Sequence, residues 1–233
     1  MGDSPLLCSK EMRGQDAHAT FVVSCVIMTM SAETRRRYTV EEYLRLEEVS
    51  PEKHEYREGE IVAMAGGTPD HSLILANVIR ELGTRLKGKP CRLYESNLRV
   101  KDPRKILYHY PDATVICGPA LFEAQDDKKS TVINPRVIVE VLSPSTEGYD
   151  RGMKFTRYRE IESFEEYVLI AQEGLSVETF LRQPDGTWSL AAYNGRDAIA
   201  KIRCLGIDLP LAEVYAGVEF VEIPGGIIEV MKH

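Results

Sequence analysis

One short run of residues constrains the fold more than any other part of this sequence. Residues 136–142, Arg-Val-Ile-Val-Glu-Val-Leu, are almost continuously aliphatic and lie between Pro135 and Pro144. A run of this length without polar alternation is typical of a strand buried on both faces, as in the centre of a mixed sheet. The sequence therefore predicts an α/β protein in which helices pack against a mixed sheet.

Glu140 interrupts this apolar run. A buried carboxylate is costly unless it is paired, hydrogen-bonded or bound to a metal. Two interpretations remain open from the residues alone. Glu140 forms a salt bridge with an arginine such as Arg136 or Arg99, or it serves as a metal ligand or general base.

Asp112 and Lys154 are further candidates for chemistry. Asp112 opens a predicted strand after Pro111, where an aspartate alone commonly caps a turn. Together with Glu140 it would place two carboxylates at the ends of neighbouring strands, a ligand set that suits Mg²⁺ or Mn²⁺. Lys154 is either an ordinary surface lysine or a cation aimed at these carboxylates. In the second case it would stabilise charge that develops on a phosphate.

The remaining pattern predicts the order of the elements. Thr39 and Glu42 form a capping box at the start of the first helix, and Gly59 marks a hairpin turn within 55–62. A polar connection over 118–134 and a short helix after Gly206 are also expected, and the last strands form an antiparallel meander. Helices are predicted over 39–49, 70–87 and 150–162, and strands over 91–100, 110–117, 136–142, 167–171, 176–182 and 188–193.

Domain organisation follows from composition. Residues 1–37 have no periodicity and are expected to be a disordered extension, residues 38–220 the folded domain and residues 221–233 a tail. The natural start is open between Met1, Met28 and Met30. No apolar run reaches the ~20 residues of a membrane span, and no signal peptide is recognisable.

Charge and cysteines limit the function classes. The net charge of −7 disfavours a protein that coats nucleic acid, but it is compatible with an enzyme that contacts nucleic acid locally. The five cysteines are scattered and form no Cys-x-x-Cys pair, which disfavours zinc and a disulfide framework. A cytoplasmic location is therefore expected.

Several motifs together resemble one family. Over residues 38–218 the chain is similar to the "putative restriction endonucleases" of the PD-(D/E)XK superfamily. Pro-Asp alone would be unspecific, whereas the combination is specific. The matching segments are 38–43, 54–62 with Glu55, His71, Pro111-Asp112, 140–146, Asp150 with Lys154 and Tyr158, and 167–170.

The resemblance implies a fold and a reaction. It implies a restriction endonuclease-like core, cleavage of DNA, and a divalent metal, Mg²⁺ or Mn²⁺, bound by Asp112 and Glu140. Glu55 would complete the acidic cluster. The third motif position is Leu142 instead of lysine, and Lys154 matches the place to which the catalytic lysine is thought to have moved in this family. A homodimer is expected, since two sites would cut both strands.

Other residues around this site are expected to contact the substrate. They are His71, Ser143, Arg151 and Tyr158. Helical spacing places Arg151, Lys154 and Tyr158 on one face. His71 stands at a helix start, where the helix dipole lowers a histidine pKa, and it either contacts phosphate or caps the helix.

Two alternatives of other classes remain. The first is a catalytically inactive binding or regulatory module on the same fold, which the acidic charge favours. The second is a serine hydrolase that uses Ser143 or Ser145 with His71, but the Gly-x-Ser-x-Gly motif is missing. Ser143 is instead expected to turn the chain after the strand and to bond a backbone group or a carboxylate.

Overall fold

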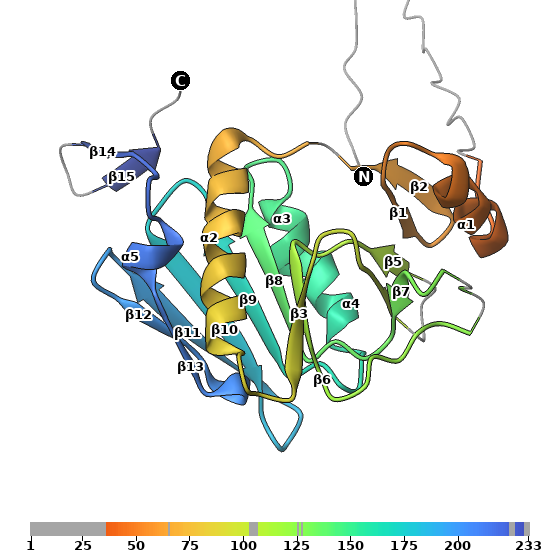
Figure 1. Cartoon of the computed structure of the whole chain (residues 1–233). Coiled ribbons are helices and arrows are strands. Elements are labelled where there is room, and N and C mark those ends of the chain that lie inside the picture. Colours follow the sequence, from red (N-terminus) through yellow and green to blue (C-terminus); the bar gives the residue numbers. More distant parts are fainter. Residues whose placement is uncertain are drawn as a thin grey trace, which may run out of the picture. The chain divides into compact units, whose positions relative to one another are not determined.

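A six-stranded mixed sheet forms the centre of the fold (Figure 1), as the sequence predicts. The computed structural model describes residues 36–64, 66–102, 107–124, 126, 128–223 and 227–230, so most of the expected extension lies outside the described residues. The sheet has the order β11-β10-β9-β8-β6-β3. Its strands are β3 (Cys91–Glu95), β6 (Ala113–Cys117), β8 (Val137–Leu142), β9 (Glu166–Ala171), β10 (Ser176–Arg182) and β11 (Trp188–Asn194).

Strand β8 is the central strand that the apolar run predicts. All six of its residues are buried. It pairs parallel with β9 and antiparallel with β6. Strands β9, β10 and β11 follow as an antiparallel meander, which confirms the expected late strands.

Helices cover both faces of this sheet. Helix α2 (Pro69–Arg85) lies on one face, together with β12 (Ile199–Ile202), β13 (Ile207–Pro210) and the short helix α5 (Leu211–Val214). Val139 and Val141 of β8 point into that core, whereas Ile138 and Leu142 point into the opposite core. The strand is therefore apolar throughout because each face has its own hydrophobic layer.

The second core is closed by one continuous helical segment. It begins as α3 (Glu147–Tyr149), widens into the π-helical turn η1 (Asp150–Lys154) and continues as α4 (Phe155–Tyr158). The sequence predicts a helix over 150–162, whereas the observed helical segment begins at Glu147 and ends at Tyr158. Phe155 and Tyr158 pack against Tyr167 of β9.

A smaller sheet of order β2-β1-β5-β4-β7 lies beside helix α1 (Val40–Val49). The Thr39 capping box and the Gly59 hairpin are both present as predicted. Tyr43 of α1 stacks on Tyr56 and contacts Tyr108. The strands are β1 (His54–Arg57), β2 (Glu60–Ala63), β4 (Arg99–Asp102), β5 (Leu107–His109) and β7 (Thr131–Val132).

Three sequence predictions about strands and cysteines are wrong. The expected strand over 91–100 is two strands, β3 and β4, because a turn at Ser96 and Asn97 sends them into different sheets. The connection over 118–134 contains β7, which pairs with β4. Cys91 and Cys117 face each other across β3 and β6 and form a disulfide. The two cysteines are far apart in the sequence, so their spacing did not predict this pair.

The remaining elements are short. The 3₁₀ turn η2 (Arg203–Leu205) joins β12 to β13. Strands β14 (Phe220–Ile223) and β15 (Ile227–Val230) pair with each other, and except for Phe220 they lie in the segment 221–233 that was expected to be a tail. In the described part of the chain, no helix has the length and apolarity needed to cross a membrane.

Candidate active site

Lys154 lies among three carboxylates that come from three elements. Its Nζ atom is 2.9 Å from Glu140 Oε1, 3.1 Å from Asp150 Oδ1 and 3.7 Å from Glu55 Oε1. All four side chains are at most 7% exposed. The structure therefore brings together Glu140, Lys154 and Glu55, three residues that the sequence analysis selected.

Asp112 lies next to this cluster. The antiparallel register of β6 and β8 pairs Ala113 with Val139, so one further step along the strands places Asp112 opposite Glu140. Asp112 Oδ2 accepts a hydrogen bond from the Val141 backbone N–H at 2.7 Å and lies 3.3 Å from His71 Nε2. Asp112 therefore lies at the end where β6 begins, next to the strand that carries Glu140 and in contact with His71 of α2.

Neutral and cationic side chains hold the carboxylates in place. The Tyr158 hydroxyl donates to Glu140 Oε1 at 3.2 Å. Arg57 donates to Glu55 Oε2 through Nε and Nη2, and His109 Nδ1 lies 3.3 Å from the same oxygen. The cluster therefore has a supporting layer that fixes the rotamers of two carboxylates.

Among the described residues, no arginine forms an ion pair with Glu140. Arg136 pairs with Glu165 at 2.9 Å, and Arg99 lies 3.7 Å from Asp126. The prediction that Glu140 forms a salt bridge with Arg136 or Arg99 is therefore wrong. Its cationic partner among the described residues is Lys154, the candidate catalytic lysine.

Burial and neighbouring charges shift the pKa values of the cluster in different directions. Burial raises the pKa of Glu140 well above its usual value, and Asp150 and Asp112 add to this effect, although Lys154 opposes it. Burial would also raise the pKa of Glu55, but Lys154, His109 and Arg57 outweigh burial and lower it. Burial lowers the pKa of Lys154, yet Glu140, Glu55 and Asp150 together raise it well above its usual value. Lys154 is therefore held as an ammonium ion.

The pKa of His71 is shifted in the direction opposite to the one that the sequence predicts. The hydrogen bond to Asp112 raises the pKa of His71, whereas the helix dipole was expected to lower it. The reason is that a carboxylate at hydrogen-bonding distance outweighs the partial charge of a helix end. The helix cap itself is Thr68, whose hydroxyl accepts from the His71 backbone N–H at 3.2 Å.

Two expected substrate contacts are not brought to the cluster. Arg151 forms ion pairs with Glu147 and Glu178 instead of with the carboxylates around Lys154. The Ser143 hydroxyl lies 3.1 Å from Ser145 Oγ and 2.9 Å from Thr146 Oγ1. It thus stabilises the turn after β8, and within the described residues its hydrogen-bond partners are neither His71 nor a carboxylate.

The roles of Asp150 and His109 were not recognised from the sequence. Asp150 precedes Lys154 by four residues, and this spacing was a usable signal for the ion pair between them. His109 is buried on β5, and burial lowers its pKa although Glu55 opposes this effect. No local pattern predicts its contact with Glu55, because that contact depends on how β1 and β5 are placed.

The chemistry of the donor set suits a divalent cation. Three carboxylates, from Glu55, Glu140 and Asp150, contact the cations Lys154 or Arg57, and the charge of a fourth, Asp112, acts on Glu140. The formal balance is therefore negative, and oxygen donors of this kind are those that Mg²⁺ prefers. Asp150 Oδ1 lies 3.1 Å from the Lys154 ammonium, so within the described residues this oxygen has a cationic partner. Within the same residues, no group of three or more His, Cys, Asp or Glu side chains is arranged as a complete metal site.

Comparison with a solved structure defines the class of protein. The chain has the α/β fold of a protein from Anabaena variabilis described as "a putative nuclease", with a TM-score of 0.61. The match covers 77% of this chain and 98% of that chain at 17% sequence identity, so it concerns the fold alone. The protein therefore shares the mixed α/β fold of that chain.

Sequence comparison then gives the family. Residues 40–212 match the Uma2 family, described as "Putative restriction endonuclease", and the chain belongs to it. Protein slr1290 of Synechocystis is 35% identical over 182 residues, which are 77% of this chain and 92% of that protein. Protein sll1609 of the same organism is 34% identical over 169 residues, with 72% and 94% covered. The resemblance stated from the motifs is confirmed.

Proposed function

We propose that the protein is a metal-dependent endonuclease that hydrolyses DNA phosphodiester bonds through a PD-(D/E)XK-type site. The observation that carries this proposal is the position of Lys154, whose ammonium lies within 4 Å of Glu55, Glu140 and Asp150. Burying charged groups costs several kcal/mol per ion, and apolar residues of similar volume would give a core of equal or greater stability. Fold stability therefore does not explain why these charged residues are buried. A site of this kind is a functional candidate because its ionisable groups are strongly perturbed.

Each residue has a proposed role. Asp112 and Glu140 would hold Mg²⁺ or Mn²⁺, with Glu55 beside them. When bound, such a metal would polarise the phosphate and activate water. The Lys154 ammonium would orient the attacking water and stabilise negative charge on the phosphate. Tyr158 holds Glu140 through its hydroxyl, and His71 holds Asp112.

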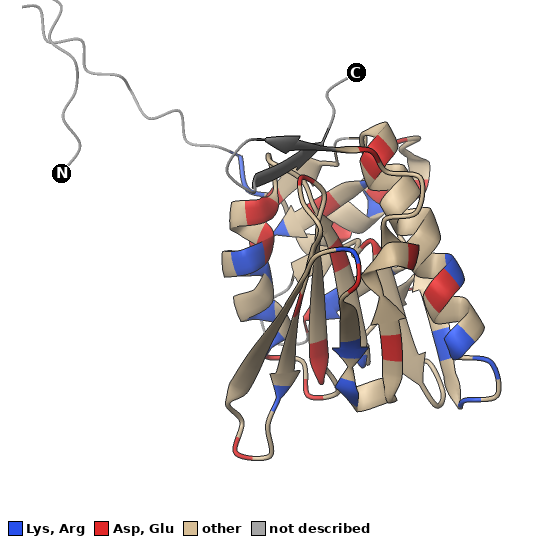
Figure 2. Ribbon diagram, turned by 90° about the vertical axis from the view of Figure 1, so that its left-hand side faces the viewer, with Lys and Arg blue, Asp and Glu red and all other residues tan. Residues whose placement is uncertain are grey.

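The charge distribution indicates how DNA would be bound. In Figure 2, Lys and Arg segments are interspersed with Asp and Glu segments over helices and strands, and neither sign dominates this view. The net charge is −7. Non-specific attraction to phosphate would therefore be weak, and binding would depend on the metal and on local contacts at the site.

The test is cleavage of supercoiled plasmid with Mg²⁺ or Mn²⁺. Asp112→Ala and Glu140→Ala are expected to lose nicking while circular dichroism shows that the fold persists. Lys129→Met is a matched control, because Lys129 is exposed and is not part of the cluster. If the wild-type protein leaves every DNA substrate intact with both metals, the proposal is wrong.

An inactive binding module is the second candidate. It is favoured by the lack of a complete three-ligand group among the described residues and by the direct contact of Lys154 with Glu140. Calorimetric titration with Mg²⁺ separates the two candidates. Heat that disappears in Asp112→Ala supports the nuclease, whereas no heat and no thermal stabilisation support the module.

We also infer a homodimer in the cytoplasm. Two sites would cut both strands of a duplex, and sedimentation would give the oligomeric state. The Cys91–Cys117 disulfide argues against the location, because disulfides rarely persist in a reducing cytoplasm. Thiol labelling of protein extracted under acid quench would decide whether this pair is oxidised in the cell.

A further inference from the structure

Strand β11 forms one edge of the main sheet, and β3 forms the other (Figure 1). The two edges differ in length and in charge. Strand β3 has five residues, which include the exposed side chains of Arg92 and Glu95. Strand β11, Trp-Ser-Leu-Ala-Ala-Tyr-Asn, has seven residues and no charged side chain, and its register with β10 is continuous. Charged residues, prolines and bulges normally keep an edge strand from pairing with another chain, and β11 has none of these.

The backbone of every second residue of β11 points away from β10. At the two ends of this hairpin, the Gln183 N–H donates to the Thr187 carbonyl and the Gly195 N–H donates to the Leu175 carbonyl. Hydrogen-bonded pairs alternate with non-hydrogen-bonded pairs in an antiparallel ladder, so the odd-numbered residues of β11 bond to β10. The N–H and C=O groups that face the open edge belong to Trp188, Leu190, Ala192 and Asn194. Within the described residues, no strand pairs with this side of β11.

An apolar surface lies beside these outward backbone groups. Leu190 is 57% exposed, and Ala192 on the same face of the strand is also exposed. Trp188, on that face too, packs into the core under α4. An exposed leucine alone is common in folded proteins, but here it adjoins a row of backbone donors and acceptors without a partner strand.

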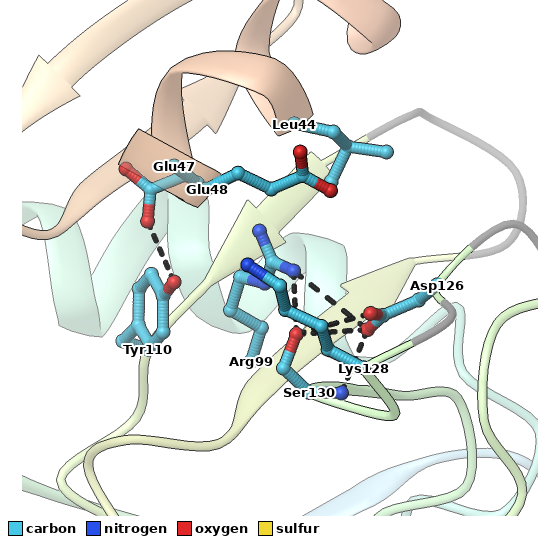
Figure 3. A pocket seen from close by; sticks show the side chains of 8 residues that line it. All are labelled: Leu44, Glu47, Glu48, Arg99, Tyr110, Asp126, Lys128 and Ser130. Carbon is cyan, nitrogen blue, oxygen red and sulfur yellow. Dashed lines mark hydrogen bonds and ion pairs between the residues drawn. The ribbon is translucent and has the colours of Figure 1, made fainter. Parts of the chain in front are cut away.

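The pocket beside α1 differs from this edge, because its charged groups have partners within the chain (Figure 3). Its cavity volume is about 220 Å³. Arg99 forms an ion pair with Asp126 and donates a hydrogen bond to Ser130. Glu47 accepts a hydrogen bond from the Tyr110 hydroxyl. The edge of β11 is therefore the feature that calls for a partner.

We propose that β11 pairs antiparallel with β11 of a second copy of this chain, so that the two main sheets become continuous. A two-fold axis at Ala191 places Leu190 opposite the partner's Ala192. The same register places Trp188 opposite the partner's Asn194. All of these residues direct their backbone groups outward, so the register forms hydrogen-bonded pairs throughout. In each pair a large side chain faces a smaller one, which lets the strands approach without a clash.

Charge and shape favour a second copy as the occupant. Each chain carries a net charge of −7, so two copies repel one another through most surfaces. A strand without charged residues brings no like charges together. The Leu190 side chains of the two copies occupy diagonal positions across the axis, about 7–8 Å apart, where long side chains still reach one another. The pairing therefore covers the exposed leucine of both chains.

The size of the contact predicts a weak dimer. A stable interface uses about 20–30 residues on each side, whereas β11 supplies seven. The dissociation constant should therefore be micromolar or weaker, and dimers should form and separate readily. The pairing names a surface for the homodimer, but it requires neither metal nor cleavage of DNA.

The test is sedimentation of the full chain without metal or DNA, from about 1 µM to about 500 µM. We expect the average mass to rise from that of one chain, 26.3 kDa, toward twice this value. Hydrogen exchange followed by NMR then locates the contact. The amides of Leu190 and Ala192 should exchange more slowly at high concentration, whereas those of Ala191 and Tyr193 should be protected at every concentration because they bond to β10.

Variants separate this edge from other surfaces. Ala192→Pro removes an N–H that faces outward and leaves the ladder with β10 intact. Leu190→Lys adds a charge to the edge, as protected edge strands have. Each should weaken the dimer by about tenfold or more, while circular dichroism shows that the fold persists. Leu121→Lys is the matched control, because Leu121 is 53% exposed and lies outside the main sheet.

Three results would overturn the proposal. The first is a chain that stays monomeric over the whole concentration range. The second is a dimer that Leu121→Lys weakens as much as Leu190→Lys does. The third is a dimer that neither edge variant weakens, which would place the contact on another surface. None of these results depends on whether the protein cleaves DNA, so failure here and failure of the proposed nuclease are distinguishable.

Discussion

Replacing Lys154 with methionine removes one ammonium and leaves its carboxylate partners buried. Methionine has a similar length and is apolar, so the change tests charge more than packing. Glu55 keeps Arg57 as a partner. Glu140 and Asp150 would each lose the cation that lies 2.9 Å and 3.1 Å away.

The expected loss of stability is large. Removing one partner of a buried ion pair costs about 3–5 kcal/mol. The side chains of Lys154, Glu140 and Asp150 are 7%, 4% and 4% exposed, so solvent screening is weak. Because folded domains are stable by only about 5–15 kcal/mol, Lys154→Met should remain folded with a much smaller margin.

The loss should also depend on pH. Burial already raises the pKa of Glu140 above 4.5, and removal of Lys154 raises it further. At pH values between the pKa of Glu140 in the unfolded chain and its higher pKa in the folded chain, Glu140 is ionised in the unfolded chain and protonated in the folded chain. The free energy of unfolding therefore falls as the pH rises through this range. Lys154 has a folded pKa raised above 10.5, so its contribution in the wild type is fully present below that pH. The difference between wild type and variant is therefore small near pH 5 and large near pH 9.

Urea unfolding followed by circular dichroism at about pH 5, 7 and 9 measures this difference. Adding Glu140→Gln to Lys154→Met should recover about 2 kcal/mol, because the uncompensated charge is gone. Lys129→Met should change stability by less than about 0.5 kcal/mol. A loss below about 1 kcal/mol at pH 9, or an equal loss at pH 5 and pH 9, would refute the view that Lys154 neutralises buried carboxylates.

Three further measurements test other parts of the structure. Asp112→Asn should lower the pKa of His71 in an NMR titration, because the contact with Asp112 raises this pKa. In the wild type, the stabilisation by this contact is fully present below pH 6.5, and it is lost as the pH rises through the raised pKa of His71. Thr39→Ala should cost about 1 kcal/mol in urea unfolding, and Thr39→Ser, which keeps the capping hydroxyl, should cost less. Reductant should lower the unfolding free energy by about 3 kcal/mol, since the Cys91–Cys117 loop spans 26 residues, and should have no effect on a Cys91→Ser, Cys117→Ser double variant.

Local sequence patterns were sufficient for the main elements of the fold. Strand β8 could be predicted because apolar residues on both faces leave few alternatives, and α1 because its capping box is a local motif. The division between β3 and β4 could not, because both segments are extended and only tertiary pairing assigns them to different sheets. The disulfide was missed for the same reason, since the cross-strand register decides which cysteines meet.

The candidate site was predictable in part. Glu140 was selected because a carboxylate in an apolar strand is costly, and Lys154 because the resemblance places a lysine there. Arg151 was expected to contact the substrate from α-helical spacing, whereas the segment contains a π-helical turn and Arg151 pairs with Glu147 and Glu178. The contact of His109 with Glu55 arises from strand pairing, which no local pattern encodes.

The π-helical turn at Asp150–Lys154 also limits how this segment can change in length. Such a turn holds one residue more than an α-helical turn would, and each helical residue turns the chain by about 100°. Deleting a residue between Glu147 and Lys154 would therefore restore a regular helix and swing the ammonium or Tyr158 away from Glu140. We expect related chains with the same site to keep the number of residues in this segment constant, while the exposed residues within it change in identity.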